Sequence, residues 1–266
     1  MFGSRRLFSF AVMTNNEVTT NTPLRDAALS RGLELVAGVS ALVGLAAFFG
    51  LHVGFYDVVD PVRQPVSSYA LVPFGEIGFA AGALGTAVAC GALALRFDGD
   101  VLPRRLLLLS AGMYVLVVVC PTDTGVEVSS LSGQVHRYAA GVAFGVMTLL
   151  TVVMAVSRGG RSLRFFAGAS VLLLVTTIVN TFLPGLADGG AWRGVPQRAL
   201  LALHIGFLLW LVISCCRDGL WDGAPRGRAD WVGGVWEWAE GSERGPGGGL
   251  MSCPGACGNR RGAMLA

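Results

Sequence analysis

Six apolar runs, each long enough to cross a lipid bilayer, dominate this amino-acid sequence. The hydrocarbon core of a membrane is about 30 Å thick, so a helix needs roughly 20 apolar residues to span it. Only 14% of the residues are charged, against about 25% in soluble domains. The sequence therefore predicts an all-α integral membrane protein with a six-helix transmembrane bundle. The predicted spans are approximately Leu33–Val53, Phe74–Leu95, Leu102–Cys120, Val135–Val156, Phe165–Leu183 and Ala199–Cys216.

Composition divides the chain into three parts. Residues 1–30 are polar, and we expect them to form an uncleaved cytoplasmic leader. Residues 31–216 hold the six spans. Residues 217–266 are rich in glycine, arginine and tryptophan and have no sustained apolar period. Such a segment cannot bury enough apolar surface to offset its ordering entropy, so a disordered C-terminal tail is predicted.

The arginines predict the orientation of the spans. Up to Arg217, eleven arginines fall on one set of alternating segments and four on the other. The arginine-rich side of a membrane protein normally faces the cytoplasm. We therefore expect a multi-pass protein of the cell membrane with both termini cytoplasmic. The three longer connections, 54–73, 121–134 and 184–197, are expected outside.

Glycines recur four residues apart in two of the predicted spans. One pair is Gly78 and Gly82, and the other is Gly141 and Gly145. This spacing lets two helix backbones approach closely. Both pairs are predicted to pack against neighbouring helices of the same bundle, and the alternative is an interface between two copies of the chain.

Polar residues gather at the predicted outer ends of the spans. Ionisable residues near a membrane favour a functional role, and the alternative is that each caps its own helix or satisfies loop backbone. Arg198 begins the last span, where the helix dipole disfavours a cation, so we expect it to pair with a carboxylate, first of all Asp123. The residues expected to converge on one outward-facing polar pocket are Ser67, Ser68, Tyr69, Asp123, His136, Gln197, Arg198 and His204.

Three segments of the sequence carry a resemblance to a known family. They are PVSSYALVPFGEIGFAAGAL, PTDTGVEVSSLSGQVHRYAAGVAF and GVPQRALL. Residues from about 33 to 216 resemble the bacterial and archaeal membrane family called domain of unknown function 998. The resemblance implies a six-span fold and no established activity, and it offers no counterpart for His204. The matching residues are Ser67, Tyr69 and Ala70, then Pro121 and Asp123, then Gly133 and His136, and finally Gly194, Gln197 and Arg198.

No motif in the sequence identifies a reaction. It contains no phosphate-binding loop, no His-x-x-x-His pair and no Gly-x-Ser-x-Gly elbow. The sequence therefore favours a non-enzymatic membrane protein that binds a small molecule or lipid or serves as an accessory subunit. We expect no cofactor, no metal and no nucleic-acid partner, and the sequence does not indicate an oligomeric state.

Two other functions stay open. One is a membrane-embedded hydrolase, in which Ser67 or Ser68 would act with His136 and Asp123. A variant of the hydrolase alternative uses a zinc ion, which would be held by His136, His204 and Asp123. The other is a small transporter, although no charged residue lies at the centre of a predicted span.

Overall fold

The chain is described here by a computed structural model, which covers residues 22–97, 100–124, 130–183 and 191–218. Within these ranges it forms six long helices and one short 3-10 helix, without strands. The elements are α1 (Thr22–Gly54), η1 (Val66–Leu71), α2 (Gly75–Arg96), α3 (Val101–Val119), α4 (Leu131–Arg158), α5 (Arg161–Phe182) and α6 (Gly194–Asp218).

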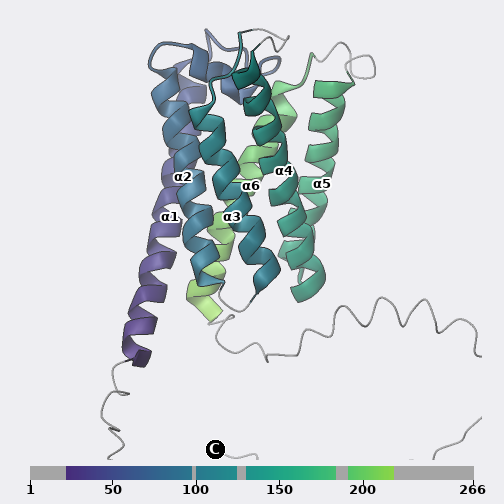
Figure 1. Ribbon diagram of the computed structural model, residues 1–266. Helices are drawn as coiled ribbons and strands as arrows, with labels where there is room; N and C mark the ends of the chain where they lie inside the picture. Colours follow the sequence, from purple (N-terminus) through teal and green to yellow (C-terminus); the bar gives the residue numbers. More distant parts are fainter. Residues whose placement is uncertain (1–21, 98–99, 125–129, 184–190, 219–266) are drawn as a thin grey trace, which may run out of the picture. The chain divides into compact units, whose positions relative to one another are not determined.

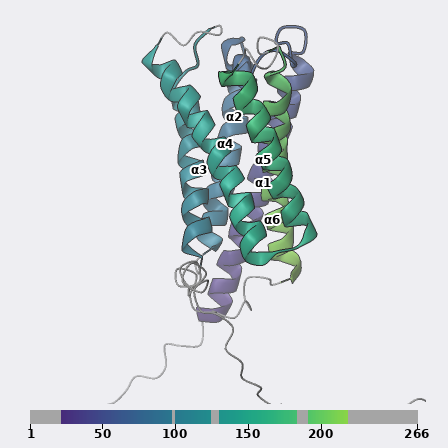
Figure 2. The same cartoon turned by 90° about the vertical axis from the view of Figure 1, so that its right-hand side faces the viewer.

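The six long helices each contain an apolar stretch of 19 to 28 residues, long enough to cross a membrane. They lie side by side along a common direction (Figures 1 and 2). Each helix packs against the next one in the sequence, and α6 packs against α1, which closes a ring. The predicted six-helix transmembrane bundle is therefore confirmed.

The first helix begins earlier than predicted. α1 starts at Thr22, so the end of the expected polar leader is helical. The rest of that leader, residues 1–21, and the expected tail from residue 219 onwards lie outside the described residues.

Small residues bring α1 and α2 close together. A Cβ atom at Gly85 would lie 2.8 Å from the carbonyl oxygen of Ser40, and one at Gly82 would lie 2.7 Å from the ring of Phe48. At Gly78 the added atom would lie 2.7 Å from the Leu51 side chain. The close packing predicted for Gly78 and Gly82 is confirmed, because a Cβ atom at either position would lie less than 3 Å from a side chain of α1, which would have to shift.

The second glycine pair does not make a helix contact. Nothing lies within 4 Å of a Cβ atom built at Gly141 or Gly145. The prediction of close packing is wrong at this pair, because the spacing permits a close approach without requiring one. Both glycines instead line a cavity inside the ring.

Two ion pairs join helices at one end of the bundle. Glu34 of α1 is only 8% exposed, and it accepts a hydrogen bond from Nε of Arg96 at 3.1 Å. The thiol of Cys216 donates to the other Glu34 oxygen at 3.4 Å. Asp100 pairs with Arg158 at the same end. We call this the Arg158 end, and the opposite end, at the top of Figure 1, the η1 end.

Candidate functional site

The connection between α1 and α2 folds into a tight turn before η1. The Asp60 carboxylate accepts a hydrogen bond from the backbone N–H of Val62 at 2.8 Å. The backbone N–H of Gln64 donates to the carbonyl oxygen of Asp60 at 2.9 Å. Pro65 then takes an extended conformation and caps the start of η1. An aspartate that bonds to backbone two residues ahead is typical of such turns.

The first residues of α6 hold this turn in place. The Nη1 atom of Arg198 donates to the carbonyl oxygens of Pro61 at 2.8 Å and Gln64 at 2.6 Å. A Cβ atom at Gly194 would lie 2.5 Å from the same two oxygens, so only glycine fits there. The Oε1 atom of Gln197 accepts from the backbone N–H of Val66 at 3.0 Å. The Gly-x-x-Gln-Arg element thus anchors the first connection to the last helix.

A second network fixes the start of α4. Ser130 is its N-cap, and the Ser130 hydroxyl accepts from the backbone N–H of Gly133 at 2.9 Å. The Asp123 carboxylate accepts from the Ser130 backbone N–H at 3.0 Å and from its hydroxyl at 2.5 Å. A Cβ atom at Gly133 would clash with that carboxylate. Asp123 therefore orients the helix that carries His136.

A cavity of about 370 Å³ lies inside the ring, near the η1 end. Its lining comes from η1 and from all six long helices. Along α4 the lining runs from Gly133 to Gly145, a stretch that covers about 18 Å of helix. The lining residues nearest the η1 end are mostly polar, and those deeper in the bundle are mostly apolar. The apolar lining includes Phe48, Phe79, Ala83, Val117, Ala140, Phe144, Leu174, Ile178 and Leu201.

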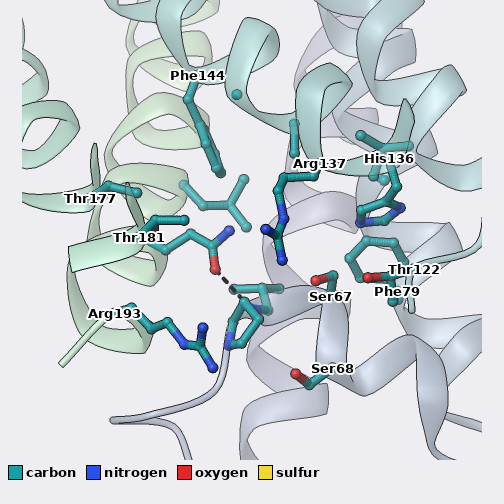
Figure 3. A pocket seen from close by; sticks show the side chains of 18 of the residues that line it. Ser67, Ser68, Phe79, Thr122, His136, Arg137, Phe144, Thr177, Thr181 and Arg193 are labelled. Atoms are coloured by element: carbon teal, nitrogen blue, oxygen red, sulfur yellow. Dashed lines mark hydrogen bonds between the residues drawn. The ribbon is translucent and has the colours of Figure 1, made fainter. Parts of the chain in front are cut away.

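Two arginines reach the polar part of the cavity. Figure 3 shows the guanidinium groups of Arg137 and Arg193 on the same side as Ser67 and Ser68, with Phe144 at the far side of the view. Nε of Arg193 donates to the carbonyl oxygen of Arg63 at 3.1 Å. Neither arginine was among the residues predicted to form the pocket. Their position could have suggested this role, since both are basic residues at the ends of predicted spans.

His136 is held in one tautomer against the cavity wall. Its Nδ1 atom lies 2.8 Å from the carbonyl oxygen of Cys120, and the ring stacks on Phe79 with centroids 6.0 Å apart. A carbonyl only accepts, so Nδ1 carries the proton of the neutral ring and Nε2 carries the lone pair. The Asp123 carboxylate accepts from Ser130, and the group that orients the His136 ring is the carbonyl of Cys120.

Tyr69 and Arg198 line a separate cavity of about 170 Å³ between α1 and α6. The Nη2 atom of Arg198 lies 3.4 Å from the Tyr69 hydroxyl, and its guanidinium carbon lies 5.4 Å from the ring centroid. The expected pair between Arg198 and Asp123 is wrong, because in the described chain Arg198 bonds to backbone carbonyls and to Tyr69. The helix dipole is thus opposed by carbonyl oxygens and not by a carboxylate.

His204 lies deeper in the bundle and lines neither cavity. It is fully buried, with Nε2 at 3.3 Å from the Thr148 hydroxyl and its ring 6.1 Å from that of Phe144. No three His, Cys, Asp or Glu side chains among the described residues lie close enough to hold a metal ion. The zinc alternative with His136, His204 and Asp123 is contradicted, since these side chains bond to different neighbours.

The expected pocket residues therefore divide into three groups. Ser67, Ser68, Asp123, His136 and Gln197 line the larger cavity. Tyr69 and Arg198 line the smaller one, and His204 is buried apart from both.

Six apolar helices closed into a ring, with polar side chains gathered around a cavity at one end, define a multi-pass membrane protein. The family model "Protein of unknown function (DUF998)" matches residues 35–215, and the chain belongs to this family. The resemblance seen in the sequence motifs is thereby confirmed. No curated protein and no solved structure matches the chain.

Proposed function

We propose that this protein binds an amphiphilic molecule with an anionic head group in the larger cavity. The single observation that carries the proposal is the gradient along the cavity wall. Arg137 and Arg193 line its polar part at the η1 end, while Phe144 and Leu201 line the deeper, apolar part. A carboxylate or phosphate fits the first region, and a hydrocarbon chain fits the second.

Hydrogen-bond donors are available for the head group. Within the described chain, Arg193 has no carboxylate at ion-pair distance, and only its Nε is bonded. Gln197 uses its Oε1 atom to accept from Val66, so its NH₂ group stays available as a donor. Guanidinium groups bind carboxylates and phosphates through paired, charge-assisted hydrogen bonds. Asp123 also lines the cavity, but its oxygens accept from Ser130.

Two apolar residues that line the cavity are also exposed. Leu71 is 42% exposed and Ile178 is 43% exposed, and both line the cavity. Ile178 belongs to a candidate membrane span, so its exposed surface faces acyl chains. This supports a ligand that partitions into the bilayer, such as a fatty acid or a lipid. A volume of about 370 Å³ is in the usual range for small-molecule sites.

The arginine distribution supports an outward-facing site. Eleven arginines against four favour the Arg158 end as the cytoplasmic one. The cavity at the η1 end then takes its ligand from the outer half of the membrane.

The test is binding of a fluorescent fatty acid, compared with the alcohol of the same chain length. Purified protein in nanodiscs should bind the acid and not the alcohol. Arg193→Gln should weaken binding about ten-fold or more, because a hydrogen bond to a charged group contributes about 1.5–3 kcal/mol. Gly145→Leu should abolish binding by filling the apolar part of the cavity.

The matched control is Gly112→Leu. Gly112 also has open space beside it, but it lies on the exposed face of α3 and lines neither cavity. The Gly112→Leu variant should bind the acid like the unaltered protein. Unchanged binding in Gly145→Leu would contradict the proposal.

A second candidate function is hydrolysis of an ester-containing lipid in the same cavity. The observation that favours it is the tautomer of His136, which leaves Nε2 as a base. The hydroxyls of Ser67 and Ser68 line the same cavity and make no hydrogen bond within the described chain. Nε2 would take the hydroxyl proton as the oxygen attacks the ester carbonyl and would return it to the departing alcohol, which leaves an acyl-serine. Water, deprotonated by the same Nε2, would then release the acyl group as a carboxylic acid and restore the serine hydroxyl.

A fluorophosphonate probe, which reacts with activated serines, separates the two functions. The hydrolase predicts labelling that Ser67→Ala or Ser68→Ala removes and that His136→Gln lowers strongly. A protein that binds the fatty acid but resists the probe is a binder and not a serine hydrolase.

A further inference from the structure

The smaller cavity lies at the seam where the first and last helices of the ring meet. Its polar lining is His52 of α1, Tyr69 of η1 and Arg198 of α6. The rest of its lining is apolar and includes Phe49 and Ala202. It is therefore a groove with a small polar patch at the η1 end and an apolar wall along two spans.

The positive charge of Arg198 has no carboxylate partner in the described chain. Its Nη1 atom donates to two backbone carbonyls, and Nη2 lies 3.4 Å from the Tyr69 hydroxyl. Nε is buried without a hydrogen-bond partner. Arg198 also lies in the first turns of α6, where the helix dipole adds positive potential. The groove is electrostatically suited to an anion.

The hydrogen bonds of Tyr69 supply a second donor. An arginine only donates, so the Tyr69 oxygen accepts from Nη2. The remaining neighbour of the hydroxyl is Nδ1 of His52, at 3.2 Å, which therefore accepts the hydroxyl proton. The neutral His52 ring then carries its own proton on Nε2, for which the described chain offers no acceptor. Arg198 and His52 can both donate to the same anion.

The apolar wall of the groove is accessible from the bilayer. Phe49 is 68% exposed, and Ala202 is exposed on the facing helix. Both belong to candidate membrane spans. Their exposed surfaces meet acyl chains and not water, so the occupant of the groove has a hydrocarbon part.

We propose that this groove is a binding site for an anionic phospholipid of the surrounding bilayer. The phosphate accepts hydrogen bonds from Arg198 and His52, and one acyl chain lies along Phe49 and Ala202. Basic pockets between membrane helices are known to bind lipid head groups, on the cytoplasmic side in the best-described cases. The site is distinct from the larger cavity and does not depend on the ligand proposed there.

The test is native mass spectrometry of protein released from nanodiscs of phosphatidylglycerol or phosphatidylcholine. The unaltered protein should retain one phosphatidylglycerol per chain and no phosphatidylcholine. Ala202→Trp should remove the retained lipid by filling the groove. His52→Ala should lower the retained fraction about ten-fold, as expected for loss of a hydrogen bond to a charged group. Arg198→Gln should do the same, but Arg198 also holds the first connection, so the other two variants decide.

The matched control is Ala46→Trp. Ala46 is exposed on α1 and lines neither cavity. The Ala46→Trp variant should retain phosphatidylglycerol like the unaltered protein. Equal retention in Ala202→Trp and Ala46→Trp, or equal retention of the two lipids, would overturn the proposal. Binding of the fluorescent fatty acid should persist in Ala202→Trp, which separates failure here from failure at the larger cavity.

Discussion

Nδ1 of His136 donates to the carbonyl oxygen of Cys120 over 2.8 Å, which joins the start of α4 to the end of α3. The same ring stacks on Phe79 of α2. One buried side chain therefore connects three helices at the wall of the larger cavity. Because Nδ1 is occupied, only Nε2 is left for a ligand or a substrate.

We expect His136→Phe to lower the free energy of unfolding by about 1–3 kcal/mol. Phenylalanine keeps a ring against Phe79 but leaves the buried carbonyl of Cys120 without its donor. Unfolding in mixed micelles with increasing dodecyl sulfate would measure the change. Tyr138→Phe, at an exposed neighbouring position, should change the free energy by less than about 0.5 kcal/mol. Equal stability of the two variants would show that the hydrogen bond contributes nothing.

Two glycine-to-alanine changes should have opposite effects. Gly85→Ala should destabilise the protein by about 1–3 kcal/mol, because the methyl group would lie 2.8 Å from the Ser40 carbonyl oxygen. Gly145→Ala should stabilise it by up to about 1 kcal/mol, since the site is open and alanine favours a helix. Thermal unfolding in detergent would compare them. The packing described for α1 and α2 is contradicted if Gly85→Ala is as stable as Gly145→Ala.

Loss of the buried carboxylate at the Arg158 end should be costly. We expect Glu34→Leu to destabilise the protein by about 3–5 kcal/mol, because it removes one partner of a buried ion pair. The exposed pair of Arg63 and Asp60 is a control, and Arg63→Gln should cost less than about 1 kcal/mol. The same micelle titration applies to both. A small effect of Glu34→Leu would mean that other groups around Arg96 compensate its charge.

Substitutions in the hydrogen-bond network that caps α4 should have coupled effects on stability. Ser130→Ala is expected to cost about 1–2 kcal/mol, because the Gly133 N–H and the Asp123 carboxylate both lose a partner. Asp123→Ala acts on the same network, so the double variant should cost less than the sum of the two single variants. Strict additivity in the double-mutant cycle would contradict the network.

The orientation of the bundle stays a prediction that reporter fusions can test. A reporter that is active only in the cytoplasm, fused within the connection between α4 and α5, should be active. A second reporter, which is active only after export, should be inactive in the connection between α4 and α5. The same reporter should be active in the connection between α1 and α2. The reverse pattern would place the η1 end in the cytoplasm.

Several of the residues that make contacts at the η1 end could be identified from the sequence. The segments that resemble the family contain Asp123, Gly133, Gln197 and Arg198, and each makes a specific contact at the η1 end. The hydrogen-bond partners of these residues could not be predicted from the sequence. For Gln197 and Arg198 the partners lie more than a hundred residues away in the chain. The burial of Glu34 could not be predicted, because one charge near the end of a span hardly changes the apolar character of that span.

The sequence alone determined the number of spans, their approximate bounds and the antiparallel order of neighbouring helices. Those features depend on the length of each apolar run and on short connections, which are local properties. Only the tertiary structure decided that Gly141 and Gly145 border a cavity and that Tyr69 and Arg198 face a different groove from Asp123. Membrane helices are apolar on every side, so the sequence pattern does not specify how each helix is rotated or which neighbour its polar residues meet.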